Sequence, residues 1–280
     1  MPRYQQYETM PPYELSDELA AKAAELGMEV NLREMKDEGY TVLRDVGPIE
    51  TNNRVRQAVL RLAQETEGKR KGYSAPLLLG RDPVFDEIVL NPKLLVMVEY
   101  MCGQGALLSQ LTGSIRPEGT PALQLHSDQN WIPAPFPDHN QLLTACWACD
   151  EFSEENGGTK VIPGSHLNRC HPSPEMEKSC EGAIPIECEA GCIPIWDGSV
   201  WHGNYPRTAP GERVVVHMTY SRLALRTVED YSHLGDDFLE GKPPEMATLL
   251  GRDDFFGSTT IELGGTDLEI FRDTAAKSKR

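Results

Sequence analysis

The sequence has little positive charge and no long apolar run. Its 27 Lys and Arg are outnumbered by 43 Asp and Glu, which gives a formal net charge of −16 at pH 7. Nucleic acids and anionic membrane surfaces are bound by clustered cations, so this balance argues against both as partners. No apolar run approaches the length of a membrane span, which argues against a helical membrane protein.

The cysteines form no regular framework. There are 7 of them among 280 residues, an odd number that fits a reducing compartment better than a disulfide-rich one. A chain of this length buries enough surface to fold without disulfides. Residues 1–6 lack the apolar core of a signal peptide. We therefore expect a soluble, cytoplasmic protein.

Short β-prone runs separated by glycine and proline dominate from residue 106 onward, and such spacing predicts a sandwich or jelly roll. We expect strands near 106–115, 122–128, 141–150, 159–162, 184–187, 192–196 and 213–221. The earlier part shows helical periodicity and capping residues around one strand at 40–46. We expect helices at 16–26, at 30–38, from a cap at Thr51, at 84–90, at 92–102 and at 243–250, and a loop at 168–182.

No internal repeat, low-complexity tract or linker divides the chain. We therefore expect one domain over residues 1–280, because large β folds commonly run to this length. It would comprise a helical N-terminal part (about 14–105), a jelly-roll core (about 106–225) and a C-terminal extension (226–280). The predicted class is mainly β with flanking helices around a double-stranded β-helix of the cupin-like, jelly-roll type.

The stretch around His126 and Asp128 carries the first chemical signal. Alternate residues of a strand point to the same face, so Gln124, His126 and Asp128 are expected on one side. An imidazole and a carboxylate placed together make two ligands for a divalent metal. Two histidines and one carboxylate on one face of the ion is the arrangement of non-haem Fe(II) oxygen chemistry.

A second histidine and an arginine follow in a suitable context. His202 lies just after a predicted turn at Gly198, and Arg213 opens the Val-rich strand that follows. An arginine that points into a barrel needs an anion, because an unpaired buried charge is costly. A dicarboxylate co-substrate would supply that anion through a two-pronged ion pair.

Taken in order, these features resemble the phytanoyl-CoA dioxygenase family of Fe(II)- and 2-oxoglutarate-dependent oxygenases. The resemblance rests on His126-x-Asp128, on His202 and on Arg213. It is strengthened by Asn-Gly-Gly at 156–158 and Pro-Gly-Ser-His at 163–166, and by an opening strand at 38–45. The similarity extends over roughly residues 30 to 225.

The resemblance implies a cofactor set and a site. Fe(II) would be held by His126, Asp128 and His202, which are the predicted metal and catalytic residues, with 2-oxoglutarate and O2 as co-substrates. Arg213 would bind the far carboxylate of 2-oxoglutarate. Further co-substrate contacts are expected from Asn204, Trp147, Gln110 and Thr112.

The substrate side of the site is less defined. Gln124 shares the metal-side face by alternation, and Asn130 and Trp131 follow the Asp ligand, so all three are expected to line the substrate pocket; ordinary loop positions are the alternative. Members of the family act on acyl-CoA thioesters and on free small molecules. The acidic chain favours a small organic molecule, and the carboxylate ligand favours hydroxylation over halogenation. The oligomeric state stays open.

The same residues allow other interpretations. Ligand type alone would admit Mn, Co or Ni. The same triad could belong to a metal-binding cupin-type isomerase, binding protein or sensor without oxygenase activity. Cys146-x-x-Cys149 suggests a zinc or redox pair, but positions three apart on a strand face opposite sides, so we expect packing residues. The Lys69–Lys71 run could grip a coenzyme A phosphate, although a solvated loop is the usual role of such a run.

Overall fold

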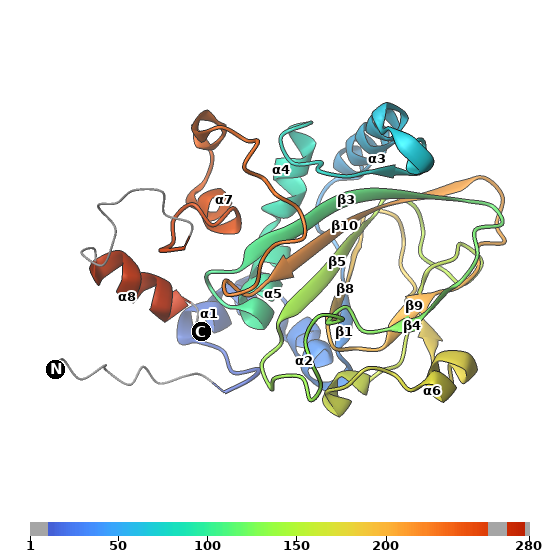
Figure 1. Cartoon of the computed structure of the whole chain (residues 1–280), viewed down its shortest axis with the longest axis horizontal. Coiled ribbons are helices and arrows are strands. Elements are labelled where there is room, and N and C mark those ends of the chain that lie inside the picture. The colour runs from blue at the N-terminus through green and yellow to red at the C-terminus, as the bar shows by residue number, and fades with distance from the viewer. Residues whose placement is uncertain (1–10, 257–267, 278–280) are drawn as a thin grey trace.

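Two antiparallel sheets facing each other form the centre of the molecule (Figure 1). The computed structural model describes residues 11–256 and 268–277. The six-stranded sheet has the order β1-β8-β5-β10-β3-β2, and the four-stranded sheet has the order β4-β9-β6-β7. The strands are β1 (Tyr40–Leu43), β2 (Ser74–Ala75), β3 (Leu107–Pro117), β4 (Leu123–His126), β5 (Leu142–Ala148), β6 (Thr159–Val161), β7 (Ile184–Pro185), β8 (Ile193–Asp197), β9 (His202–Asn204) and β10 (Glu212–Ser221). The predicted jelly-roll class is confirmed.

Helices cover the outer face of the six-stranded sheet, where α3 and α5 pack against its strands. The α-helices are α1 (Asp17–Glu25), α2 (Glu29–Glu38), α3 (Ile49–Glu65), α4 (Val84–Val89), α5 (Pro92–Cys102), α6 (Pro174–Ser179), α7 (Pro244–Leu249) and α8 (Leu268–Lys277). Short 3-10 turns lie at Gly68–Arg70, Ser165–Asn168 and Asp236–Leu239. The larger apolar core lies between this sheet face and the helices, and a smaller one fills the space between the two sheets.

The N-terminal helices begin and end where their sequence signals indicate. Ser16 caps α1 by accepting a hydrogen bond from the Leu19 amide at 3.2 Å. Gly39 ends α2 in the left-handed conformation at φ 79°, which glycine adopts without steric cost. The expected cap at Thr51 is wrong. The backbone is extended at Pro48, the residue before the helix, so α3 begins at Ile49. Thr51 therefore lies inside the helix, where it is buried.

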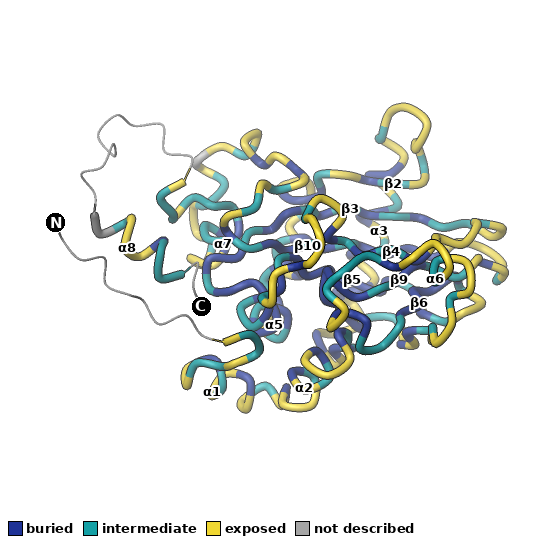
Figure 2. Tube along the Cα trace, turned by 60° about the horizontal axis from the view of Figure 1, so that its bottom comes forward, coloured by how far each residue is buried: buried dark blue, intermediate teal, exposed yellow. Residues whose placement is uncertain are grey.

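The expected loop at 168–182 contains α6. Ser173 caps it by accepting a hydrogen bond from the Met176 amide at 3.3 Å, and Pro174 occupies the first turn. A six-residue helix has too few turns to show helical periodicity, so the polar composition predicted a loop. Two short strands, β2 and β9, were not predicted for a similar reason. Figure 2 shows α6 as a largely exposed segment beside β4, β9 and β6.

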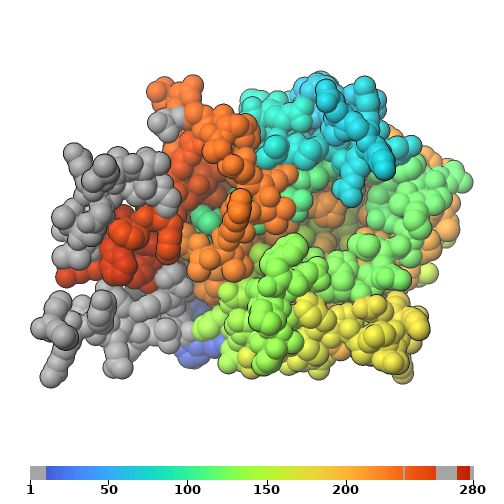
Figure 3. Space-filling model, in the orientation of Figure 1, coloured from blue at the N-terminus to red at the C-terminus, as the bar shows by residue number. Residues whose placement is uncertain are grey.

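The chain after β10 folds back against the six-stranded sheet (Figure 3, orange). Glu229 is buried there, and its carboxylate accepts hydrogen bonds from the backbone amides of Leu77 and Leu111 at 2.9 and 2.7 Å and from the Tyr231 hydroxyl at 2.8 Å. These bonds fasten the segment to the edge of β3. Within the described residues, no helix combines the length and apolarity needed to cross a membrane.

Candidate metal centre

The pairing of β4 with β9 brings two histidines side by side. His126 lies opposite His202 in this pair, and their ring centroids are 4.3 Å apart. The strands can approach because Gly203 has no side chain. A Cβ at that position would stand 2.5 Å from the Leu123 carbonyl oxygen and 2.8 Å from that of Gln124. The glycine that follows His202 in the sequence therefore sets the spacing of the two rings.

The protonation of both rings is set by backbone carbonyls. Nδ1 of His126 lies 2.9 Å from the Gln124 carbonyl oxygen, and Nδ1 of His202 lies 3.1 Å from that of Val200. A carbonyl oxygen only accepts, so each Nδ1 carries a hydrogen and each Nε2 is the ring atom that could bind a metal. The Nε2 atoms lie 3.6 and 3.5 Å from the same Asp128 oxygen, Oδ1. Three ligand atoms thus converge on one point.

Asp128 is held by two donors from the opposite sheet. Its Oδ2 accepts hydrogen bonds from the Thr144 hydroxyl at 2.8 Å and from the Trp196 indole at 3.0 Å. Oδ1 is thereby left facing the histidines. Burial alone would raise the pKa of Asp128, but the neighbouring His202 and His126 outweigh it and hold that pKa well below its ordinary value. The carboxylate is therefore ionised and oriented before any ion binds.

The three side chains fit a divalent ion that keeps open positions. Their ligand atoms all lie within 4.8 Å of one another. The His202 side chain is 5% exposed, whereas those of His126 and Asp128 are 29% and 24% exposed, so one side of the cluster is accessible. A facial set of two imidazoles and one carboxylate with an accessible side is the non-haem Fe(II) arrangement. Among the described residues, no other group of three or more His, Cys, Asp or Glu side chains is placed to hold an ion.

Arg213 lies in the interior and forms no ion pair with any residue that the structure describes. It is 2% exposed, and its Nε and Nη1 atoms have no hydrogen-bond partner among the described residues. Its guanidinium carbon lies 4.5 Å from the centroid of the Phe152 ring. Burial, with the neighbouring Arg116 second, lowers the pKa of Arg213 to about 10. A buried cation with free donors is a binding site for a carboxylate.

Asn204, the last residue of β9, contacts a second arginine on the facing sheet. Its side-chain oxygen accepts a hydrogen bond from Arg116 at 3.4 Å, and its amide nitrogen donates to Thr159 at 3.5 Å. Arg116 lies directly opposite Arg213 in the β3–β10 pair. Asn204 is therefore linked through Arg116 to the polar interior around Arg213, and its contact with the co-substrate stays a prediction.

A neutral histidine lies on the same interior face of β10. His217 is four residues along the strand from Arg213, and its Nδ1 is 3.3 Å from the Cys146 sulfur. Burial, and then the charge of Arg213, lowers the pKa of His217 to about 4. Burial raises the pKa of the Cys146 thiol. Both groups are uncharged near pH 7, so they present hydrogen-bonding but not ionic contacts.

The two polar residues predicted on β3 have different environments. Gln110 lies opposite Thr219, on the interior face that also carries Thr144. Thr112 points to the same face, but its hydroxyl donates a hydrogen bond to Glu229 at 2.7 Å. That proton is already used, so the structure does not support Thr112 as a donor to the co-substrate.

The predicted co-substrate contact of Trp147 is corrected. Its side chain lies on the outer, helix-covered face of β5, and its indole nitrogen donates to the Asn52 side chain of α3 at 2.9 Å. The reason is the strand period of two, which sends Thr144 and Cys146 inward and Trp147 outward. Trp147 is a core residue.

The residues expected to line the substrate pocket lie at the surface near the ligands. Gln124 and Asn130 are exposed, and Trp131 is 67% exposed. The defined contribution of Gln124 comes from its backbone, which orients the His126 ring. Their role toward a substrate stays a prediction.

Sequence reasoning missed the two residues that hold Asp128. Thr144 could have been found as a polar residue within an otherwise apolar strand. Trp196 gave no signal, because its contact depends on the β5–β8 register, in which it lies opposite Thr144. Phe152, under Arg213, was missed for the same reason. The expected packing role of the Cys146 and Cys149 pair agrees with their positions in different apolar clusters.

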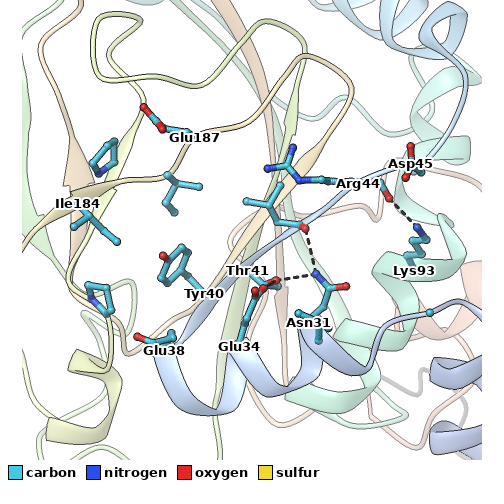
Figure 4. Close-up of a pocket in the computed structure, with 16 residues that line it drawn as sticks. Asn31, Glu34, Glu38, Tyr40, Thr41, Arg44, Asp45, Lys93, Ile184 and Glu187 are labelled. Atoms are coloured by element: carbon cyan, nitrogen blue, oxygen red, sulfur yellow. Dashed lines mark hydrogen bonds between the residues drawn. The ribbon is translucent and has the colours of Figure 1, made fainter.

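A separate groove of about 840 Å³ lies between α2, β1 and β7 (Figure 4). Its lining mixes the acidic Glu34, Glu38 and Glu187 with the basic Arg44 and Lys93. None of the metal ligands contributes to it. The groove follows the outer edge of β1, and with Asp45 its acidic side chains outnumber its basic ones.

Comparison with known proteins agrees with this geometry. The model of the family described as phytanoyl-CoA dioxygenase (PhyH) matches residues 35–215. An uncharacterized protein of Mycobacterium tuberculosis, Rv1501, is 26% identical over 227 residues, covering 76% of this chain and 82% of that protein. The dioxygenase af480 of Aspergillus fumigatus is 28% identical over 173 residues, covering 60% of this chain and 55% of that protein.

Two solved structures share the fold. EctD from S. alaskensis with 2-oxoglutarate and 5-hydroxyectoine aligns with a TM-score of 0.62 and 18% identity, over 80% of this chain and 87% of that one. HygX from Streptomyces hygroscopicus with nickel and 2-oxoglutarate aligns with a TM-score of 0.61 and 17% identity, over 71% and 88%. With the family match spanning more than half of its length, the chain belongs to the phytanoyl-CoA dioxygenase family and is a non-haem iron dioxygenase.

Proposed function

We propose that the protein uses Fe(II), 2-oxoglutarate and O2 to hydroxylate a C–H bond of a small organic molecule. His126, Asp128 and His202 would hold the metal, and Arg213 would hold the far carboxylate of 2-oxoglutarate. The observation that carries the proposal is the joint presence of a convergent three-ligand set and a buried arginine with free donors. A metal site alone would not need such an arginine.

Bound Fe(II) and 2-oxoglutarate would supply the oxidising chemistry, which yields succinate and CO2 beside the oxidised substrate. The chain's own residues orient the proposed metal ligands. Thr144 and Trp196 fix the Asp128 carboxylate, and the backbone fixes both imidazole tautomers. Asn204 and Gln110 are proposed as further polar contacts to the co-substrate. Burial, and then the charge of Arg213, lowers the pKa of His217 to about 4, so His217 adds no second positive charge beside Arg213 near pH 7.

A small organic substrate is supported by the neighbours and by the charge. The structures of EctD and HygX were solved with 5-hydroxyectoine and with hygromycin B, respectively. The net charge of −16 offers little to the phosphates of a coenzyme A ester or of a nucleic acid. Gln124, Asn130 and Trp131 are proposed to contact this substrate at the accessible side of the centre. Hydroxylation is the proposed outcome because Asp128 occupies the position that a halide would need.

We also propose that the chain acts as one oxygenase domain in the cytoplasm. The N-terminal helices and the segment around Glu229 both pack on the six-stranded sheet, which supports a single unit. Seven free thiols support a reducing compartment.

The test is an anaerobic titration. Fe(II) and then 2-oxoglutarate are added to metal-free protein, and the weak visible charge-transfer band of the chelated co-substrate is followed. We expect the band in the wild type and no band in His202→Ala. In Arg213→Met the metal should still bind, while the affinity for 2-oxoglutarate should fall by about 100-fold, because the lost contact is a buried, charge-assisted one.

Arg54→Met is the control, because Arg54 is an exposed arginine on α3 that pairs with Glu87, whereas Arg213 is buried without an ion pair among the described residues. Its 2-oxoglutarate affinity should equal that of the wild type. If metal binds but no band forms, or if Arg213→Met binds 2-oxoglutarate normally, the oxygenase proposal fails. The alternative, a cupin-type metal protein that does no oxygen chemistry, would then explain the site better.

A further inference from the structure

A lysine is buried on the outer side of the four-stranded sheet without a carboxylate. Lys160 of β6 is 9% exposed. Its neighbour Val161 packs between the two sheets, so strand alternation directs Lys160 to the other side. Buried lysines are almost always ion-paired. Within the described part of the chain Lys160 has no ion pair, and its ammonium lies 5.7 Å from the Tyr205 ring centroid.

The hydrogen bond of this ammonium goes to a cysteine. The Lys160 Nζ atom donates to Cys180 Sγ at 3.2 Å. Cys180 follows α6 in the left-handed conformation at φ 49°, and its thiol lies 3.5 Å from the Glu177 carbonyl oxygen. The sulfur is therefore held from both sides, with an amine nitrogen directly beside it. Cys180 is only half-buried, so small reagents can reach it.

We propose that Lys160 and Cys180 form a peroxide-sensitive modification site that closes to a covalent S–N link. In the first step the Cys180 thiol is oxidised by hydrogen peroxide to a sulfenic acid, and one water leaves. In the second step the deprotonated Lys160 amine attacks the sulfur, and hydroxide leaves with a proton as a second water. The cysteine loses two electrons, the peroxide gains them, and the product is a sulfenamide.

Proximity favours this outcome over the usual fates of a sulfenic acid. An amine held at 3.2 Å reacts as an intramolecular partner, with the large advantage that such partners have over groups in solution. The other half-buried cysteine, Cys170, has no lysine contact among the described residues, so its sulfenic acid would have no such partner.

The link would join α6 to the sheet that carries the metal ligands. Lys160 lies opposite Gly203 in the β6–β9 pair, next to His202. α6 itself packs against β4, the strand of His126. The modification would thus fix the helix against both strands of the metal centre, on the side away from Arg213.

The experiment uses the purified full-length protein treated with hydrogen peroxide, followed by tryptic digestion and mass spectrometry with and without a thiol reductant. We expect a cross-linked pair of peptides that lacks two hydrogens and is not cleaved after Lys160. Reduction should restore both the cleavage and the free thiol. Cys170 should give sulfenic, sulfinic or mixed products without a lysine link.

Lys160→Arg keeps the positive charge but should not form the link, and its Cys180 should instead proceed to sulfinic acid. Cys180→Ser should give no product at Lys160. Circular dichroism confirms that both variants are folded. The proposal is overturned if Cys180 of the folded wild type is oxidised without a link to Lys160, or if a lysine link forms equally at Cys170. It is also overturned if the linked product forms at Cys180 less than about tenfold faster than at Cys170.

Discussion

The two faces of the six-stranded sheet have opposite chemistry. The outer face of β5 and β10 carries Trp147, Val214, Val216 and other apolar side chains that pack under helices. The inner face of the same strands carries Thr144, Cys146, Arg213 and His217. Nearly all of these residues are buried, so burial alone does not separate core from site.

The difference follows from the strand period of two. Thr144 and Trp147 are three residues apart on one buried strand, yet one holds the Asp128 carboxylate, a proposed metal ligand, and the other fills the helix-covered core. A polar residue inside an apolar strand is the clearer mark of a site than a large aromatic one, because a buried polar group needs a partner. The predictions below test this division.

The largest effect is expected for His202, a proposed metal ligand on β9 of the four-stranded sheet. His202→Ala removes one of three ligand atoms, and Fe(II) affinity should fall by more than about 100-fold, since changes to the outer partners of a ligand already cost up to that much. Anaerobic metal titration measures it. His233→Ala, at an exposed histidine, is the control and should bind Fe(II) as the wild type does. Tight binding in His202→Ala would remove this residue from the ligand set.

Thr144→Val keeps the shape of the side chain and removes the hydrogen bond to Asp128. Fe(II) affinity should fall by roughly 10- to 100-fold, because the carboxylate loses one of the two donors that orient it. Thr219→Val is a matched control, because Thr219 lies opposite Thr144 on β10 without a hydrogen bond to the carboxylate. If Fe(II) affinity falls equally in both variants, the loss reflects the polarity of the inner face in general and not the hydrogen bond to Asp128.

Trp147→Phe should affect stability and not the site. The substitution leaves the buried Asn52 side-chain oxygen without its donor and opens a small space, so the free energy of unfolding should fall by about 2 kcal/mol. Chemical denaturation measures this change, and the charge-transfer titration should give an unaltered 2-oxoglutarate affinity. If the 2-oxoglutarate affinity fell while the free energy of unfolding stayed at the wild-type value, Trp147 would have to contact the co-substrate, contrary to its position in the structure.

The smallest effect is a pH dependence. Burial lowers the pKa of His126, but the hydrogen bond and charge of Asp128 outweigh it and raise that pKa above the ordinary 6.5. A raised pKa keeps the imidazole protonated to higher pH, and the metal must displace that proton. Fe(II) affinity should therefore rise by about tenfold per pH unit from about pH 6 until the pKa is passed. An affinity that is flat over this range would contradict the assigned coupling.

Most regular elements were predictable because their signals are local. Ser16, Gly39 and Pro92 mark helix ends by their own backbone and side-chain properties, and these helices occur as expected. α6, β9 and β2 were missed because so few residues show no periodicity, and the ten-residue α8 was also not predicted. The start of α3 was misplaced because Thr51 is a good cap by residue type, whereas the extended Pro48 decides where the helix begins.

The class of fold, the three proposed ligand residues that lie close together and the interior position of Arg213 could be predicted from the sequence, because strand alternation and residue chemistry are properties of short segments. Tertiary structure was needed to show that Thr144 and Trp196 hold Asp128, that the Thr112 hydroxyl is bonded to Glu229, and that Lys160 lies against Cys180. Each of these contacts joins residues far apart in the chain. Its existence depends on strand register and on the packing of the sheets, which no single segment specifies.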